Sequence, residues 1–448
     1  MNFTNTYLNR VYQDVAKRYE HEPEFLQAVT EFFESIELII STLPHFEEQG
    51  VLERLVEPER IIQFRVPWVD DENHVQVNRG YRVEFNSAIG PYKGGLRFDP
   101  SVNLSILKFL GFEQTFKNAL TGLPLGGGKG GSDFTSKGKS DREIMRFCQS
   151  FMSELYRHLG PNTDVPAGDI GVGSKEIGYL FGYYRKLRNE FTGTITGKGL
   201  SYGGSMVRTE ATGYGVCYFV QEILKNQAHD TFVGKRVIVS GCGNVGIYAA
   251  KKAIELGAIV VGMSKTNSCV IDEHGVDLNL ITRLVQDKKD LMSYSDIYPH
   301  ARVSSSNKEL WKVPCDIALP CATQNELDVE DAKILIQNKV KIICEGANMP
   351  TTLEATALFI KNGILFAPGK AANAGGVATS GLEMSQNSIR ESWTFEVVDE
   401  KLKAIMSRIY HACYEASVRV GQPGNLVLGA NISGFLKVYD AMVHQGII

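Results

Sequence analysis

The stretch from Arg236 to Leu256 constrains the fold of this chain more than any other. A β-branched run, 236–240, predicts a strand, and an apolar pattern over 244–256 predicts a helix. Between them stands a G-x-G-x-x-G sequence. Its first glycine suits a tight turn, the second lets backbone approach a pyrophosphate, and the third lets helix and strand pack closely. The alternative is a strand–helix turn that binds nothing. We predict a dinucleotide site that includes Gly241, Gly243, Asn244, Val245 and Gly246.

Strands and helices continue to alternate after this motif. Short apolar runs predict further strands at 258–262, 316–320, 341–345 and 364–367. Apolar strands that alternate with helices are typical of a parallel sheet covered on both faces. We therefore predict a Rossmann-type, doubly wound dinucleotide-binding domain over 201–420.

The first 200 residues have a different pattern, and a chain of 448 residues is long enough for two domains. Apolar residues at helical spacing over 29–40 predict an amphipathic helix, and alternating residues predict strands at 74–77 and 81–85. Helices are expected at 103–120 and 140–158, the second with a Ser140–Glu143 capping box. We predict an N-terminal α/β domain for substrate binding and oligomerisation over 1–200. A helix at about 421–448 should return to it, 191–204 should be a hinge, and the active site should lie in the cleft between the domains.

The bulk composition is that of a globular protein without a strongly charged surface. The formal net charge is −4, and the eight cysteines form no C-x-x-C pair. We found no apolar run of the ~18 residues that span a bilayer, and no signal-peptide pattern at the start. We therefore expect a cytoplasmic protein with reduced thiols, no bound metal, and neither nucleic acid nor membrane as a partner.

The end of the strand at 258–262, the second strand of the dinucleotide-binding domain, bears on the choice of dinucleotide. NAD sites usually place Asp or Glu about 20 residues beyond the glycine motif, where it binds the ribose 2′-hydroxyl. Here the sequence reads Ser264-Lys265, and no carboxylate follows until Asp272. A hydroxyl and an ammonium group suit a 2′-phosphate, so we predict NADP, bound in part by Ser264 and Lys265. The alternative is an ordinary solvated lysine and an enzyme that uses NAD.

Three lysines of the first domain stand in glycine-rich or turn-rich surroundings: Lys93, Lys117 and Lys129. Glycines on both sides of Lys129 permit unusual backbone angles and close approach of a ligand. A solvated charge explains one such lysine but not three together. Asp169 stands between small residues in 166–173, which makes it a candidate proton carrier. Its alternative role is an Asx turn or a helix cap.

These segments carry a family resemblance. In chain order they are 92–98, 123–131, 166–173, 208–215, 241–246, 345–348 and 370–387. Together they resemble the glutamate dehydrogenase family, in particular its shorter, bacterial-type hexameric members within the wider Glu/Leu/Phe/Val dehydrogenases. Blocks in the same order along nearly the whole chain are far more specific than any single motif.

The resemblance implies a role for particular residues. Lys129 matches the catalytic lysine and Asp169 the proton-relay aspartate. Lys93 and Ser380 match positions that hold the substrate's side-chain carboxylate. Further matched positions hold the α-carboxylate (Gln114, Lys117 and the Gly168 backbone) or line the nicotinamide and phosphates (Thr212, Asn244, Ala322, Asn348 and Asn373).

The implied reaction is the reversible oxidative deamination of L-glutamate to 2-oxoglutarate and ammonium with NADP(H), an oxidoreductase activity of amino-acid metabolism and nitrogen assimilation. Lys129 would act as general acid and base, with its pKa lowered by the neighbouring lysines and by desolvation. The expected assembly is a homohexamer.

Two rival functions remain. Leucine- and phenylalanine-type dehydrogenases have an apolar residue where Lys93 stands, and an apolar substrate would leave that lysine buried and unpaired. A non-catalytic protein on the same scaffold would be expected to lack Lys129 or Asp169.

Overall fold

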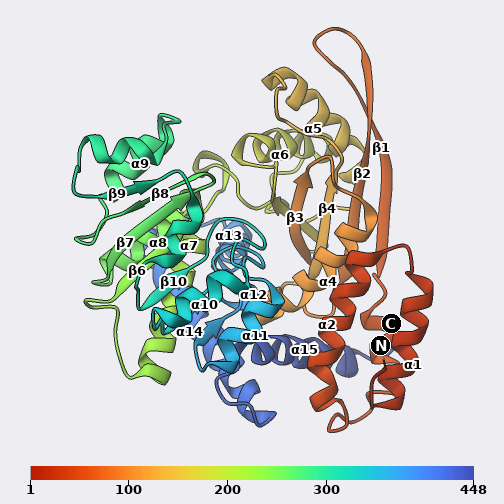
Figure 1. Cartoon of the computed structure of the whole chain (residues 1–448). Coiled ribbons are helices and arrows are strands. Elements are labelled where there is room, and N and C mark those ends of the chain that lie inside the picture. The colour runs from red at the N-terminus through yellow and green to blue at the C-terminus, as the bar shows by residue number, and fades with distance from the viewer. Residues whose placement is uncertain (1) are drawn as a thin grey trace. The chain divides into compact units, whose positions relative to one another are not determined.

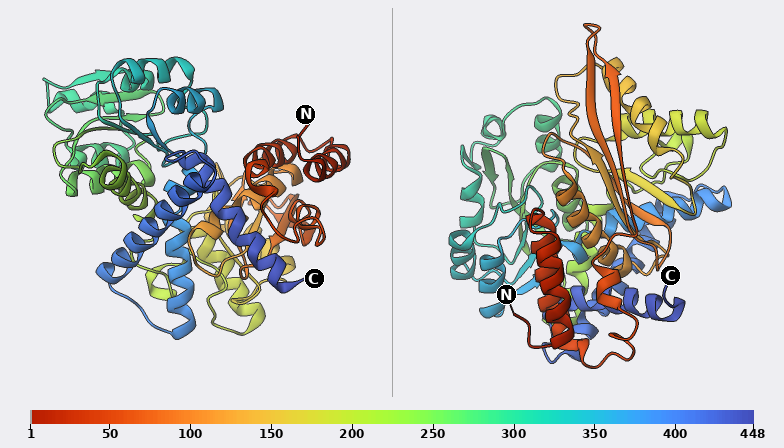
Figure 2. Two further views of the ribbon diagram at one scale, coloured as in Figure 1. Left: turned by 90° about the horizontal axis from the view of Figure 1, so that it is seen from below. Right: turned by 90° about the vertical axis from the view of Figure 1, so that its right-hand side faces the viewer.

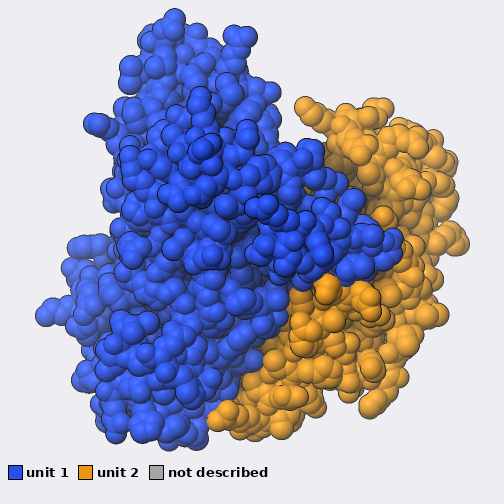
Figure 3. All heavy atoms as spheres, turned by 180° about the vertical axis from the view of Figure 1, so that it is seen from behind, with its two compact units in different colours: residues 1–206, 377–398, 431–448 blue, residues 207–376, 399–430 orange. Residues whose placement is uncertain are grey.

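The computed structural model describes residues 2–448, which form two compact units coloured separately in Figure 3. Unit 1 contains the chain up to Met206, together with 377–398 and 431–448. Unit 2 contains 207–376 and 399–430. The chain thus passes from one unit to the other four times, and each unit is assembled from separate stretches of sequence.

Unit 1 is built on a five-stranded mixed sheet in the order β1-β2-β4-β3-β5 (Figure 1). β1 pairs antiparallel with β2 and β2 with β4, whereas β3 is parallel to both β4 and β5. The strands are β1 (Arg60–Val69), β2 (Val75–Asn86), β3 (Tyr92–Phe98), β4 (Gly127–Ser132) and β5 (Asp164–Gly168). In Figures 1 and 2 the β1–β2 hairpin extends past the other strands of this sheet.

β1 and the continuity of β2 were not predicted. β1 contains Pro67, which cannot donate to a ladder, but β1 is the edge strand and so tolerates it. β2 was expected as two short strands and is one, because it pairs with β1 along the whole hairpin. Gly80, in its middle, lies opposite Phe64, and a side chain there would overlap the Phe64 ring.

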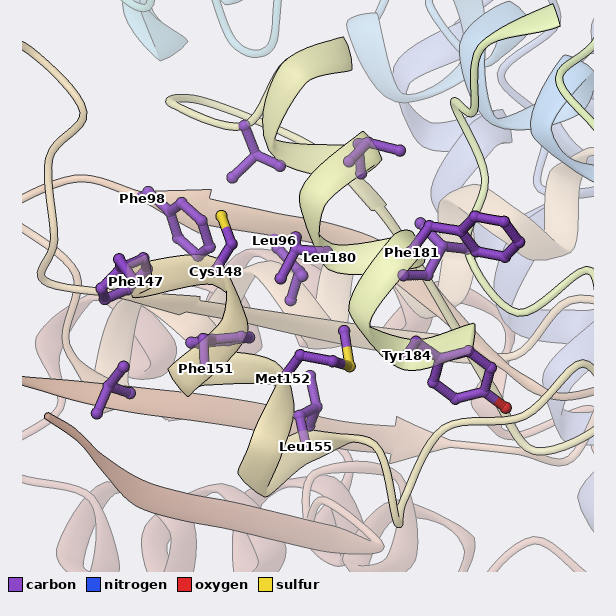
Figure 4. Close-up of a cluster of buried hydrophobic side chains, with 14 of the residues drawn as sticks. Leu96, Phe98, Phe147, Cys148, Phe151, Met152, Leu155, Leu180, Phe181 and Tyr184 are labelled. Atoms are coloured by element: carbon purple, nitrogen blue, oxygen red, sulfur yellow. The ribbon is translucent and has the colours of Figure 1, made fainter. Parts of the chain in front are cut away.

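Six helices belong wholly to unit 1: α1 (Thr6–Arg18), α2 (Pro23–Ile40), α3 (Val51–Leu55), α4 (Leu104–Leu120), α5 (Asp141–Leu155) and α6 (Ser174–Arg188). α4 packs on β2 and β4 with α2 against it, while α5 packs on β1 and α6. Ser140 and Glu143 form the predicted capping box at the start of α5. Figure 4 shows the core between α5, α6 and the sheet, a single buried cluster to which Phe98, Phe147, Phe151, Leu180 and Tyr184 belong.

β3 and β4 lie in the glycine-rich region for which only a helix was predicted. A side chain at Gly94 would overlap the carbonyl oxygen of Gly128, and one at Gly127 would overlap Thr115 of α4. These glycines let two strands and a helix pack more closely than any other residue would allow. The close packing fixes the backbone around Lys93 and Lys129.

Unit 2 is built on a seven-stranded sheet in the order β12-β11-β10-β6-β7-β8-β9. The first five strands are parallel, and β8 and β9 complete the edge in antiparallel fashion. The strands are β6 (Arg236–Ser240), β7 (Ile259–Lys265), β8 (Ser268–Ile271), β9 (Arg302–Ser304), β10 (Ile317–Leu319), β11 (Ile342–Cys344) and β12 (Leu365–Ala367). The predicted parallel strands are all present; the β8–β9 addition was not foreseen.

The helices of unit 2 are α7 (Ala211–Ile223), α8 (Asn244–Glu255), α9 (Leu278–Gln286), α10 (Val329–Gln337), α11 (Leu353–Lys361) and α12 (Gly369–Ala372). A π-helical turn (Leu224–Ala228) follows α7, and 3₁₀ turns lie at 291–296 and 307–312; a further 3₁₀ turn, at 200–202, belongs to unit 1. Three long helices continue from one unit into the other: α13 (Gly375–Ile389), α14 (Phe395–Arg419) and α15 (Leu426–Gln445). The two-domain α/β class agrees with the prediction.

The unit boundaries differ in detail from the predicted domains. Residues 377–398 belong to unit 1, whereas the sequence pattern placed them in the dinucleotide domain. The segment 191–204, expected as a hinge, lies within unit 1, where it is bound to α13.

α15 is the one helix among residues 2–448 with the length and composition to cross a membrane, and 61% of its apolar stretch is buried inside the protein. A core helix of a water-soluble protein meets the same criterion. Over the same residues, no cluster of three His, Cys, Asp or Glu side chains is arranged to hold a metal ion.

Candidate active site

The strand register of unit 1 brings three charged residues to one place. Leu96 of β3 pairs with Gly130 of β4 on one side and with Gly168 of β5 on the other. Lys129 is therefore level with Gly95, and Asp169, which follows β5, is level with Arg97. Gly95 is needed here, because a Cβ atom at this position would lie 2.8 Å from the Cβ of Asp169.

The three side chains form one ion cluster. Lys129 Nζ lies 3.1 Å from Asp169 Oδ2, and Arg97 Nε donates to the same oxygen at 2.8 Å. Lys129 is 5% exposed. The two predicted catalytic residues are thus in contact, and Arg97 joins them.

The surroundings shift both pKa values. Burial lowers the pKa of Lys129, with help from the charges of Arg97 and Arg82, although Asp169 opposes the shift. Burial would raise the pKa of Asp169, but Lys129 and Arg97 outweigh it and lower that pKa to about 2. Lys129 is therefore the group that titrates toward neutrality, and Asp169 is an anion unless its cations move or lose charge.

The predicted carboxylate-binding residues lie on β3, α4 and α13. Lys93 is 1% exposed in β3, and its carbonyl oxygen accepts a hydrogen bond from Asn118 at 2.9 Å. Gln114, one turn earlier on α4, donates to the Asn118 side chain at 2.7 Å. Asn118 also donates to Gly126 O, so this one buried side chain connects β3, α4 and the segment before β4. Lys117 lies on the same helix.

Ser380 is buried in α13, next to the segment that leads into β4. A Cβ atom at the adjacent Gly381 would lie 3.3 Å from Leu125. One turn further along α13, Glu383 accepts from Lys198 at 2.6 Å, with both side chains 1% exposed. This buried ion pair, together with a 2.8 Å bond from Gln386 to Ser205, holds the helix that carries Ser380.

Sequence reasoning did not single out Arg97, Asn118 or the Lys198–Glu383 pair. Arg97 lies inside the segment 92–98, four residues after Lys93 in the same strand, so the two side chains point to the same face of the sheet. That even spacing was the available signal. Nothing local in the sequence distinguishes Lys198 and Glu383, which are 185 positions apart.

The glycine motif of unit 2 has the geometry expected of a phosphate-binding turn. Gly241 has a φ of +84°, and a side chain at Gly246 would overlap the carbonyl oxygen of Gly241. Gly243 has open space where a side chain would stand, and no side chain caps the first turn of α8. Free N–H groups at a helix N-terminus favour a phosphate.

The predicted 2′-phosphate residues end β7, which is longer than expected. Ser264 is buried and pairs with Ser240 of β6, while Lys265 Nζ donates to the carbonyl oxygen of Lys289 at 3.2 Å. Asp272 is not available to a ribose hydroxyl, because it is buried against His300 and the His274 backbone.

An acidic side chain does lie near Lys265. The Asp290 carboxylate accepts a hydrogen bond from Met292 N at 2.9 Å. That bond lowers the pKa of Asp290, and the charge of Lys265 lowers it further to a smaller extent. A 2′-phosphate would therefore compete with this carboxylate for the lysine.

The other predicted cofactor residues also lie in unit 2. Asn373 donates to Asn348 Oδ1 at 2.9 Å and to Ala347 O at 3.0 Å, which fixes the loop after β11. Thr212 is close to Gly376, where a Cβ atom would lie 2.7 Å from its hydroxyl. Ala322 is exposed after β10.

A buried carboxylate supports this region. Glu345 accepts from the backbone N–H groups of Gly369 at 2.7 Å and Thr351 at 3.2 Å, and burial raises its pKa to about 7. All predicted substrate residues thus lie in unit 1, and all predicted cofactor residues lie in unit 2.

Comparison with known proteins shows two matching family models. Residues 203–446 match the Glutamate/Leucine/Phenylalanine/Valine dehydrogenase model, and residues 58–186 match the Glu/Leu/Phe/Val dehydrogenase dimerisation domain.

Individual relatives match over nearly their whole length. An NADP-specific glutamate dehydrogenase of Salmonella typhimurium is 58% identical over 97% of each chain. An NAD-specific glutamate dehydrogenase of Bacteroides fragilis is 56% identical over 98% of this chain and 100% of the relative. The crystal structure of a Plasmodium falciparum glutamate dehydrogenase superposes with a TM-score of 0.95 at 51% identity, covering 99% of this chain and 95% of that one. The chain therefore belongs to the glutamate/leucine/phenylalanine/valine dehydrogenase family.

Proposed function

We propose that this protein catalyses the reversible oxidative deamination of L-glutamate to 2-oxoglutarate and ammonium with NADP(H). The observation that carries the proposal is the buried Lys129, 3.1 Å from Asp169, in a unit that also buries Lys93. Glutamate dehydrogenase relatives at 56–58% identity support the reaction and the substrate.

In this proposal the substrate's two carboxylates select its orientation. Lys93 and Ser380 bind the side-chain carboxylate, and Lys117 and Gln114 bind the α-carboxylate beside the backbone of Gly168. Two lysine side chains suit a substrate with two carboxylates, and the glutamate dehydrogenase relatives at 56–58% identity favour an acidic substrate over an aliphatic one.

Lys129 and Asp169 carry the protons. NADP⁺, when bound, supplies the hydride acceptor for the substrate's Cα–H. In the deamination direction Lys129, as the free amine, removes a proton from the water that attacks the imine carbon. Asp169 takes a proton from the substrate's α-ammonium group before hydride transfer and returns it to the nitrogen of the resulting carbinolamine. Ammonia leaves as the carbonyl forms, and the carbinolamine hydroxyl releases its proton to solvent. The lowered pKa of Lys129 suits this role.

The glycine motif and the end of β7 are proposed to hold the dinucleotide. Gly241, Gly243, Asn244, Val245 and Gly246 take the pyrophosphate, and Ser264 with Lys265 take the 2′-phosphate. Thr212, Ala322, Asn348 and Asn373 line the nicotinamide end. The unfilled space at Gly243 and the uncapped start of α8 support the phosphate contact.

We also propose that the protein is a cytoplasmic homohexamer. Self-association is supported by the match to the family's dimerisation domain and by the apolar face of the β1–β2 hairpin. That face carries Val69, Val75 and Val77, which are 38%, 71% and 60% exposed.

Initial rates with NADPH or NADH, ammonium, and either 2-oxoglutarate or an aliphatic 2-oxo acid test the function. We expect rapid oxidation of NADPH with 2-oxoglutarate. Replacing both Lys93 by Leu and Ser380 by Val should shift the ratio of kcat/KM values toward the aliphatic acid. A wild type that prefers the aliphatic acid would contradict the proposed substrate, and an inactive one would contradict the proposed function.

A further inference from the structure

The two oxygens of the Asp169 carboxylate have different environments. Oδ2 accepts from Arg97 Nε at 2.8 Å and lies 3.1 Å from Lys129 Nζ. Oδ1 accepts no hydrogen bond from any residue among 2–448, and the side chain is 18% exposed. One oxygen is therefore held on both sides, while the other can be approached.

Arg97 and Lys129 are not equivalent as holders of Oδ2. Lys129 is buried and has a lowered pKa, and in the proposed reaction it gains and loses a proton. A neutral amine is a weaker partner for a carboxylate than an ammonium ion. Arginine does not lose its proton at any pH at which an enzyme works, and its planar guanidinium keeps a fixed direction. Only Arg97 can hold Asp169 through the whole proton cycle.

The backbone also fixes Arg97 more firmly than a surface arginine. Arg97 pairs with Gly131 of β4, and the pair between Leu96 and Gly168 on the other side sets Asp169 level with it. Phe98 N donates to Ile170 O at 2.8 Å, so the residues that follow Arg97 and Asp169 are tied directly. The side chain of Arg97 is 17% exposed.

From this geometry we propose that Arg97 is a positioning residue of the reaction. It holds Asp169 by Oδ2 throughout turnover, so that Oδ1 is the oxygen that exchanges protons with the substrate nitrogen. The inference rests on the proposed function and adds to it the group that orients the relay.

Other charged groups near this cluster bear on its pH dependence. Arg82 faces Lys129 but is itself fully buried and hydrogen-bonded to Asp164. Glu84, with a pKa raised to about 7 by burial, interacts with Asp164 and with Arg60. Of these groups only Arg97 contacts the Asp169 carboxylate from β3, so its removal changes the relay without breaking the Arg82–Asp164 pair.

The test compares Arg97→Gln and Arg97→Lys with a control, Arg188→Gln, which removes an exposed arginine paired with Glu190 at 3.4 Å. We expect Arg97→Gln to lower kcat by about 10- to 100-fold, in line with the loss caused by a misplaced catalytic group. The KM values for 2-oxoglutarate and NADPH should change little, because Arg97 contacts neither ligand in this proposal. Arg97→Lys keeps the positive charge but not the planar guanidinium group, so its kcat should lie between those of the wild type and Arg97→Gln.

Two readouts separate positioning from a general structural role. The acid limb of the kcat pH profile for glutamate oxidation should move to higher pH in Arg97→Gln, because Lys129, which acts there as the free amine, loses a neighbouring cation that lowers its pKa. The solvent isotope effect on kcat should rise, while the effect of [2-²H]glutamate should fall, as proton transfer becomes limiting. Arg188→Gln should match the wild type in every readout.

Activity of wild type with 2-oxoglutarate is established first, so failure of the proposed function is seen separately. The inference is wrong if an active wild type yields an Arg97→Gln variant with kcat within about twofold of the control. It is equally wrong if both Arg97 variants lose activity in parallel with a lowered melting temperature and an unmoved acid limb.

Discussion

At the scale of single residues, the central feature is a lysine in a place where most lysines are not found. Lys129 has glycines on either side, lies in a strand, and is buried beside one carboxylate and two guanidinium groups. Its burial lowers its pKa, and the folded protein tolerates this because Asp169 partly compensates the charge.

Replacing Lys129 by Ala should abolish turnover and leave cofactor binding nearly unchanged. A removed acid–base group typically costs 10²–10⁴-fold in kcat. The measurements are kcat and the Kd for NADPH from fluorescence titration. Lys175→Ala, which removes an exposed lysine paired with Asp141, is the matched control. A kcat above about a tenth of wild type would rule out the acid–base role.

Replacing Lys265 by Glu should raise the KM for NADPH and leave kcat nearly unchanged. The ribose lies far from the reacting nicotinamide carbon, so the lost contact stabilises the bound cofactor equally before and during hydride transfer. Lys361→Glu, at the end of α11 in the same unit, provides the control for charge. An unchanged NADPH KM would mean that Lys265 serves only its contact with the Lys289 carbonyl oxygen. Relatives of similar identity include an NADP-specific and an NAD-specific enzyme, so family membership does not determine which dinucleotide this protein prefers.

At the scale of elements, the sequence predicted unit 2 better than unit 1. β6 spans the predicted residues, and α8 begins at Asn244 as expected, because apolar runs and a glycine motif are local signals. β3 and β4 escaped prediction, since glycine disfavours strands and these two strands depend on contacts with each other and with α4. The role of Arg97 was not predicted for the same reason, because only the pairing of β3 with β5 brings it next to Asp169.

Two glycines of the phosphate-binding turn offer a matched pair of substitutions. Gly246→Ala places a methyl group on the carbonyl oxygen of Gly241 and should destabilise the fold by about 1–3 kcal/mol, which lowers the melting temperature. Gly243→Ala meets no atom within 4 Å, so it should leave the melting temperature nearly unchanged and raise the KM for NADPH. Equal melting temperatures would show that this turn relaxes easily, and an unchanged KM at Gly243 would place the pyrophosphate elsewhere.

At the scale of the whole molecule, the β1–β2 hairpin exposes an apolar face that bears on assembly. The outward face of the β1–β2 hairpin pairs Val69 with Val75 and Pro67 with Val77, which makes a continuous apolar patch. Directly beyond it, Arg65 stands opposite Arg79, and like charges in this arrangement repel. An apolar patch bordered by charge on an edge hairpin is typical of a surface that another chain covers.

Light scattering should therefore give a mass six times the 49.6 kDa of one chain. Changing both Val75 and Val77 to Glu should reduce that mass, because charge is costly in a covered apolar face. The same double change to Glu at two exposed apolar positions of α11, Leu353 and Ile360, is the control. A monomeric wild type would overturn self-association, and an unchanged mass in the double variant would show that a different surface is used.

The return of α13 and α15 to unit 1 has a consequence for how the protein is made. The first 206 residues cannot complete their own folded unit until 377–398 and 431–448 have left the ribosome. At translation rates of about 5–20 residues per second, the early strands wait on the order of 10–50 s for those helices. During that time, the faces that α13 and α15 later cover are exposed in the nascent chain. Slow synthesis of 207–430 would then be expected to increase the demand for chaperones without any change in the stability of the finished protein.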